Sequence, residues 1–168
     1  GGRPLLEHAL AHAAAAPVDR VVVVLGAGAD EVLARVDLHG AEPVVCRDWE
    51  EGMAAPLRAG IATLAGCAAV VVLLGDQPLV PAAAVDRVLA ARRPDRDAVR
   101  ATYEGQPGHP VVLERRLFPA IAGLEGDTGA RALLAGRSVV EVACEGIADP
   151  LDVDSPDDLR IAEQALAS

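Results

Sequence analysis

The sequence contains no lysine, so arginine supplies all 15 of its basic residues. Its 25 acidic residues outnumber them and leave a net charge of −10 over 168 residues. Nucleic-acid binding depends on clustered cations that face the phosphates, and this acidic chain has no basic run to supply them. The composition therefore argues against nucleic acid as a partner.

Aromatic residues are almost absent, with a single Trp, a single Tyr and a single Phe. Because 52% of the residues are nonetheless hydrophobic, the core must consist of Val, Leu, Ile and Ala, as in parallel strands buried on both faces. The longest uninterrupted apolar run is Cys67–Leu74, far shorter than the roughly 20 residues that a membrane span needs. No apolar stretch follows a basic start as in a signal peptide, and we expect no membrane partner.

Cysteine is also scarce. The three cysteines, Cys46, Cys67 and Cys144, are odd in number and have no CxxC spacing, which favours a reducing compartment without a zinc cluster. The length fits one domain, since domains average about 150 residues. We therefore expect a cytoplasmic protein whose residues 1–168 form a single domain.

What the sequence does contain is a regular alternation of apolar runs and helical periods. The runs predict strands at Val21–Leu25, Pro43–Cys46, Val70–Leu74, Ala98–Thr102, Val111–Leu113, Val139–Val142 and Leu151–Val153. The periods predict helices at Pro4–Ala15, Asp30–Val36, Pro56–Leu64, Pro81–Ala91, Asp127–Leu134 and Pro156–Leu166. This alternation predicts an α/β fold with a mostly parallel sheet and helices on both sides.

Two acidic segments are candidates for binding a cation. Asp76 lies in Gly75-Asp76-Gln77-Pro78, directly after a predicted buried strand, at the sheet edge where α/β folds bind ligands. Asp152 and Asp154 alternate in a predicted strand and would share one face, where two carboxylates favour a hard cation between them. The alternatives are a turn role for Asp76 ahead of Pro78 and a helix-capping role for Asp154 or Ser155.

Two further segments could contact an anion. In Gly105–Val111, Gly108 and Pro110 shape a turn that would present His109 beside the sheet edge as a hydrogen-bond donor. In Glu125–Arg131, Asp127 or Thr128 would open a helix whose free N–H groups favour an anion, with Arg131 one turn inside. A surface histidine and a simply capped helix are the alternatives.

The segment Leu25–Asp30 resembles half of a dinucleotide fingerprint, and Asp48 lies about 20 residues downstream, where a ribose-binding acid would sit. Glu31 replaces the third glycine, however, and would repel a pyrophosphate. An NAD(P)-dependent oxidoreductase therefore remains an alternative.

Four motifs occur in the order seen in the molybdenum cofactor cytidylyltransferase family, which the chain resembles over nearly its whole length. They are Gly75-Asp76-Gln77-Pro78, Gly108-His109-Pro110, Gly126-Asp127-Thr128-Gly129-Ala130-Arg131 and Asp152-Val153-Asp154-Ser155-Pro156-Asp157-Asp158. Arg47–Met53, followed by Leu57–Gly60, also resembles that family's segment after its second strand.

The resemblance implies a Rossmann-like three-layer α/β/α sandwich of the nucleotide-diphospho-sugar transferase type. It implies transfer of CMP from CTP to a phosphorylated acceptor such as molybdopterin, with release of pyrophosphate. Asp76, Asp152 and Asp154 would bind Mg²⁺, and Asp76 and Asp154 would be catalytic. The remaining contacts implied for the nucleotide come from Gly75, Gln77, Pro78, Gly108, His109 and Arg131. CTP and GTP both stay open, and a molybdoenzyme is a candidate maturation partner.

The chain departs from the family pattern at two places. The Gly-rich signature loop with its Lys is absent, and we expect an N-terminal strand and phosphate-binding loop to precede the segment that begins Gly1-Gly2-Arg3-Pro4. Where relatives carry a run of serines after Gly-Met, this chain has Ala54, Ala55 and Pro56. A non-catalytic binding or maturation protein is the remaining alternative.

Overall fold

The computed structural model describes residues 2–167, without the side chain of Arg131. Its strands are β1 (Val22–Leu25), β2 (Glu42–Val45), β3 (Ala69–Val72), β4 (Ala98–Tyr103), β5 (Gln106–Glu114) and β6 (Val139–Ala143). Its α-helices are α1 (Leu5–Ala14), α2 (Ala29–Arg35), α3 (Ala54–Thr63), α4 (Ala82–Ala90), α5 (Phe118–Ala122), α6 (Ala130–Leu133) and α7 (Pro156–Leu166). Two short 3₁₀ helices are η1 (Trp49–Glu51) and η2 (Arg115–Leu117). None of the helices in this part of the chain is long and apolar enough to cross a bilayer.

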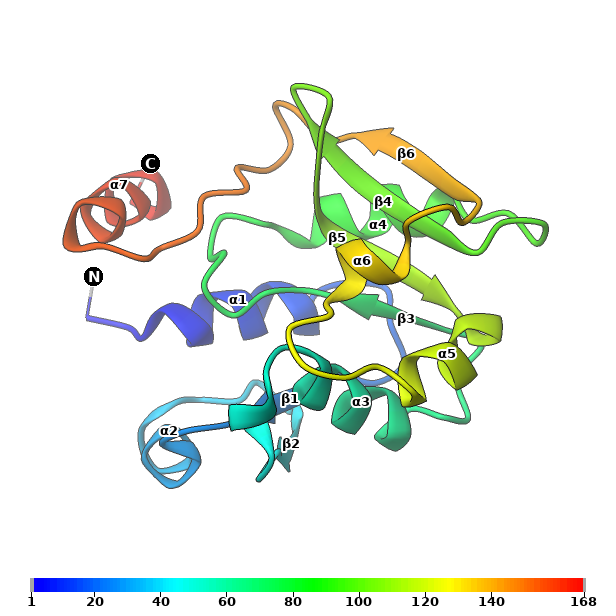
Figure 1. The fold of residues 1–168 in the computed structure, drawn as a ribbon. Helices are drawn as coiled ribbons and strands as arrows, with labels where there is room; N and C mark the ends of the chain where they lie inside the picture. Colours follow the sequence, from blue (N-terminus) through cyan, green and yellow to red (C-terminus); the bar gives the residue numbers. More distant parts are fainter. Residues whose placement is uncertain (1, 168) are drawn as a thin grey trace.

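The strands form two sheets. β1 and β2 pair in parallel, and the larger sheet has the order β3-β5-β4-β6 (Figure 1). Within it β3 and β4 both run antiparallel to β5, while β4 and β6 are parallel. β3, β4 and β6 therefore share one direction and β5 alone opposes them. The predicted α/β class with a parallel-rich sheet is confirmed.

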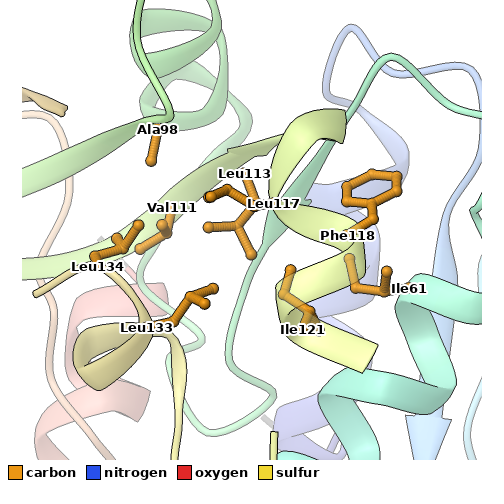
Figure 2. Packing of buried hydrophobic residues seen from close by; sticks show 9 residues of the cluster. All are labelled: Ile61, Ala98, Val111, Leu113, Leu117, Phe118, Ile121, Leu133 and Leu134. Carbon is orange, nitrogen blue, oxygen red and sulfur yellow. The ribbon is translucent and has the colours of Figure 1, made fainter. Parts of the chain in front are cut away.

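Helices cover both faces of the larger sheet, because the strands alternate apolar side chains between the two faces. One face packs against α3, η2, α5 and α6 through the cluster in Figure 2: Ile61, Ala98, Val111, Leu113, Leu117, Phe118, Ile121, Leu133 and Leu134. The other face packs against α4 through a second cluster: Val88, Val99, Ala101, Tyr103, Val112 and Cys144. This arrangement is a three-layer α/β/α sandwich.

The two-stranded sheet has its own small core. Leu10 of α1, Val23 and Leu25 of β1, and Ala29 of α2 are buried together with Ala41. Within the described residues, β1 pairs only with β2 and β3 pairs only with β5. Each of these two strands therefore keeps one edge without a strand partner.

The structure corrects three predictions about the elements. Residues 151–153 are not a strand, because the main chain there makes a single bond to the Asp76 loop rather than a ladder. The helix predicted at Asp127–Leu134 is shorter: it spans only Ala130–Leu133, with Gly129 as its N-cap. The sequence reading also missed α5 and the two 3₁₀ helices.

Candidate functional site

The loop after β3 and the segment before α7 lie side by side at the carboxyl end of the larger sheet. The amide of Val153 donates to the carbonyl oxygen of Asp76 at 3.0 Å. The amide of Asp149 donates to the carbonyl of Leu79 at 3.3 Å. These two bonds bring the acidic segments at residues 76 and 152–154 together although more than seventy positions separate them in the chain.

Gln77 links the two segments through its side chain. It is only 5% exposed, and its Nε2 donates to Asp152 Oδ1 at 2.8 Å and to the carbonyl of Pro150 at 3.2 Å. Its Oε1 is buried and has no hydrogen-bond partner among the described residues. The amide therefore holds one oxygen of Asp152 in place. Asp76, the residue before Gln77, and Asp152 are both exposed.

These carboxylates fit a magnesium ion better than a protein-enclosed metal. No group of three or more His, Cys, Asp or Glu side chains among residues 2–167 is gathered closely enough to hold a metal ion by itself. Magnesium is usually bound through one or two carboxylates, with waters and substrate phosphates completing its shell. Asp76 and Asp152 suit that pattern.

Asp154 lies just before the last helix and is exposed. Its neighbour Ser155 caps α7: the Ser155 hydroxyl accepts from the Asp158 amide at 3.2 Å, and Asp158 completes a capping box. The helix-capping alternative therefore holds for Ser155. The catalytic and metal-binding roles of Asp154 stay predictions.

His109, in β5, is the third residue of the candidate site beside Asp76 and Asp152. Burial lowers the pKa of its imidazole, while the negative charges of Asp152 and Asp76 act in the opposite direction. The carboxylates of both acidic segments thus lie within electrostatic reach of the ring. A neutral imidazole keeps one N–H, so His109 can donate a hydrogen bond to an anionic ligand near neutral pH.

The other predicted contacts differ in exposure. Gly75 is exposed, and a Cβ added there would lie 3.0 Å from Leu6 of α1. Pro78 is fully buried, and Gly108 lies against the ring of Tyr103. Pro78 and Gln77 therefore sit beneath the surface and support the turn that carries Asp76. Direct ligand contacts of Gly75 and Gly108 stay predictions.

The Gly126–Asp127 turn packs on Gly52 instead of opening a long helix. The amide of Ala54 donates to the carbonyl of Gly126 at 3.0 Å, and a Cβ on Gly52 would lie 2.6 Å from the Gly126 backbone. Because α6 begins at Ala130 with Gly129 as its N-cap, Asp127 and Thr128 do not open the helix as predicted, and the anion contact there stays a prediction. The side chain of Arg131 lies outside the described residues.

The glycine loop after β1 is explained by packing. A Cβ on Gly26 would lie 2.9 Å from Trp49 Cβ, so Gly26 leaves room for the indole of η1. Gly28 is the left-handed N-cap of α2, whose first turn carries Asp30 and Glu31. Two carboxylates at this helix start oppose a bound pyrophosphate.

Two surface hollows, of about 510 and 440 Å³, lie on either side of Arg58. The first is also lined by residues 122–126, and the second by residues 45–48. Arg58 Nη1 donates to the carbonyl of Leu124 at 2.5 Å, and Nη2 pairs with Glu51 at 2.8 Å. Neither hollow includes Asp76 or Asp152, both of which are exposed.

The chain is thus a three-layer α/β/α sandwich with acidic loops at the carboxyl edge of its sheet, which is where α/β proteins of this class bind their ligands. Comparison with known families makes this more specific. Residues 1–142 match the model of the MobA-like NTP transferase domain, and the chain belongs to that family.

Two curated relatives carry different names. The chain is 37% identical over 141 residues to nicotine blue oxidoreductase of Paenarthrobacter nicotinovorans, covering 79% of this chain and 69% of the relative. It is 32% identical over 132 residues to the purine catabolism protein PucB of Bacillus subtilis, covering 73% of this chain and 62% of that protein.

Among solved structures, Rv0371c of Mycobacterium tuberculosis superposes with a TM-score of 0.85 at 34% identity, covering 100% of this chain and 86% of that one. A manganese complex of Rv0371c gives a TM-score of 0.82. The molybdopterin-guanine dinucleotide biosynthesis protein A of Archaeoglobus fulgidus, at 19% identity and a TM-score of 0.71, shares the fold.

Proposed function

We propose that this protein is a nucleotidyltransferase that transfers a nucleoside monophosphate from CTP or GTP to a phosphorylated, pterin-like acceptor and releases pyrophosphate. The observation that carries the proposal is the junction at the sheet edge. There Gln77 and the Val153 amide bring Asp152 beside Asp76, in a chain of the NTP transferase family.

In this proposal Asp76 and Asp152 hold Mg²⁺, and Asp154, two residues further along the chain, is a further candidate ligand and catalytic residue. A bound magnesium ion neutralises charge on the triphosphate, which is the main requirement of phosphoryl-type transfer. The need is strong here because the protein carries a net charge of −10 and no lysine. His109 donates a hydrogen bond to a phosphate oxygen from the β5 side of the group.

The acceptor is proposed from the family resemblance and from the loop Arg47–Met53. Trp49 and Met53 are 42% and 58% exposed, so this loop offers an apolar surface to a ring system. Ala54 and Ala55, where hydroxyls would bind polar groups, are buried. A molybdoenzyme that receives the product is the proposed partner.

An NAD(P)-dependent oxidoreductase is the second candidate, and the name of the relative from Paenarthrobacter nicotinovorans favours it. The packing of Gly26 on Trp49 and the acidic first turn of α2 argue against a dinucleotide in that loop. The two candidates differ in the nucleotide that the protein consumes: CTP or GTP in the first, NAD(P)H in the second.

We also propose that residues 1–168 form one domain whose sheet is completed by a preceding strand and phosphate-binding loop. The free edges of β1 and β3 support this, as does the partial exposure of every residue of β3 between two helical layers. Hydrogen exchange tests it: the outward amides of β1 and β3 should exchange rapidly in residues 1–168 alone and slowly where a further strand pairs with them.

Pyrophosphate release, measured with CTP or GTP, Mg²⁺ and a phosphorylated pterin, tests the activity. Asp76→Asn, which removes one carboxylate charge, should lower the rate by about 100-fold, as loss of a preorganised charge in other active sites does. Asp86→Asn, on the exposed side of α4, is the matched control and should leave the rate unchanged. NADH oxidation without pyrophosphate release would instead favour the oxidoreductase.

A further inference from the structure

The hairpin that carries His109 contains an irregularity at that residue. β4 and β5 are joined by Glu104 and Gly105, whose φ angles are +50° and +74°, as in a two-residue hairpin turn. Ala101 pairs with Gly108, but the next residue along β4, Arg100, pairs with Val111. His109 and Pro110 are therefore two extra residues in β5, and the resulting bulge redirects the chain at His109.

Tyr103 holds this bulge through two different contacts. Its hydroxyl donates to the carbonyl oxygen of His109 at 2.7 Å. Its ring lies on Gly108, where an added Cβ would come within 2.8 Å of Cδ2 and 2.9 Å of Cε2. Only a glycine at position 108 lets the ring approach closely enough for the hydroxyl to reach the next residue's carbonyl.

The burial of the Tyr103 side chain favours both contacts. Its side chain is 8% exposed and belongs to the cluster packed against α4. Burial raises the pKa of the phenol to about 12, so the hydroxyl keeps its proton. Without this donor the partly buried carbonyl of His109 would lose its hydrogen bond to Tyr103, at a cost to stability.

We propose that Tyr103 is a positioning residue that fixes the backbone at His109 and thereby holds the imidazole beside Asp76 and Asp152. This inference rests on the proposed function for its consequence in ligand binding. Its structural part, that the tyrosine hydroxyl sets the place of the His109 ring, is independent of any reaction.

Tyr103→Phe tests the inference because it removes the hydroxyl and keeps the ring. Ser138→Ala is the matched control: the Ser138 hydroxyl donates to Asp97 Oδ2 at 2.9 Å, beside the opposite end of β4. Tyr103→Phe removes one hydroxyl hydrogen bond, and Ser138→Ala removes two because the Ser138 hydroxyl also accepts from the Asp97 amide at 3.2 Å. Both variants should melt slightly below the wild type. Only Tyr103→Phe should weaken Mg²⁺-dependent binding of CTP, by about 3- to 10-fold.

A double variant separates positioning from general destabilisation. If Tyr103 acts through His109, then Tyr103→Phe should cause no further loss of CTP affinity in a His109→Ala protein. An equal further loss in that background would overturn the inference. Unchanged CTP affinity in Tyr103→Phe alone would overturn it as well.

A second readout does not depend on the proposed function. The ring resonance of His109, assigned by its disappearance in His109→Gln, should shift or broaden in Tyr103→Phe and stay in place in Ser138→Ala. A resonance that stays in place in Tyr103→Phe would overturn the inference even if CTP does not bind to any form. Absence of CTP binding in the wild type would contradict only the proposed function.

Discussion

At the scale of single residues, Gln77 illustrates how position decides role. The sequence places it in a motif next to Asp76, and the resemblance suggests contact with a ligand. In the structure it is buried and donates to Asp152 and Pro150. In the proposed site Gln77 therefore acts through Asp152, whose oxygen it holds next to the Asp76 loop.

Gln77→Glu should weaken binding of Mn²⁺, used as a spectroscopic substitute for Mg²⁺, by about 10-fold or more, because a carboxylate replaces the donor that faces Asp152. Titration followed by electron paramagnetic resonance measures the affinity. Gln106→Glu, at an exposed position of β5, adds the same charge and should have little effect. Equal losses in the two variants would show that net charge alone matters.

Much of the candidate site could be predicted from the sequence, but the side-chain contacts that connect its segments could not. The placement of Asp76 just after a strand is a local property, and Asp76 does lie in the loop that follows β3. Its role there stays a prediction. Gln77 and Asp152 are 75 positions apart in the sequence. The hydrogen bond from Tyr103 to His109 depends on a β-bulge, whose place is set by how β4 and β5 pair. Neither contact leaves a periodic signal in one sequence.

At the scale of elements, the sequence predicts the ends of strands β1–β4 and β6 to within a few residues. β5 is the exception, because it extends further in both directions than its apolar run. Its first half contains Gln106, Pro107 and Gly108, which are poor strand formers. Pairing with β4 overrides that preference. Helix α5 was missed because it follows η2 without a polar break, starting at Phe118 with Pro119 in its first turn.

Gly52 lies at the end of η1, where the chain packs against the Gly126–Asp127 turn. Its φ is +109° and a Cβ there would lie 2.6 Å from the Gly126 backbone. Gly52→Ala should therefore lower the free energy of unfolding by about 2–4 kcal/mol, through backbone strain and a clash that no side-chain rotation relieves. Chemical denaturation measures the loss.

Gly136→Ala is the control for Gly52→Ala, because Gly136 has a φ of +73° and nothing within 4 Å of an added Cβ. It should cost only the strain of the left-handed backbone, about 1–2 kcal/mol. If the two alanines cost the same, the docking of the Gly126 turn on Gly52 does not contribute to stability.

Helix α7 depends on its cap more than on its packing. Ala162 is its only buried residue within the described chain, and in Figure 1 the helix stands to one side of the sheet. Ser155→Ala removes the capping box and should destabilise the helix by about 1 kcal/mol. Hydrogen exchange should quicken in residues 156–166 while the melting temperature hardly changes. A lower melting temperature with unaltered exchange in α7 would contradict this.

At the scale of the whole molecule, acid should destabilise the fold in two steps. Burial lowers the pKa of His8, His12 and His109 below the ordinary value of 6.5. The unfolded chain then binds more protons than the folded one below about pH 6.5, so stability falls as pH decreases through that value. Hydrogen bonds lower the pKa of Asp97 and Asp158, and the stability that they contribute is lost at lower pH.

His12 provides the test of the first step, because its Nδ1 is buried without a hydrogen-bond partner among the described residues. Denaturation midpoints measured between pH 8 and pH 5 should fall less steeply in His12→Gln than in the wild type. Identical slopes in the two proteins would contradict the assignment.

The central claim is that the acidic edge binds a nucleoside triphosphate through a divalent cation, and thermal shift with CTP, GTP, ATP and NADH, each with and without Mg²⁺, tests it most directly. A ligand at about 100 times its dissociation constant adds about 2.7 kcal/mol to stability, a rise of roughly 5–10 °C for a domain of this size. We predict a rise with CTP or GTP only when Mg²⁺ is present, absent in Asp76→Asn and kept in Asp86→Asn. A rise with NADH and none with any triphosphate would contradict the account.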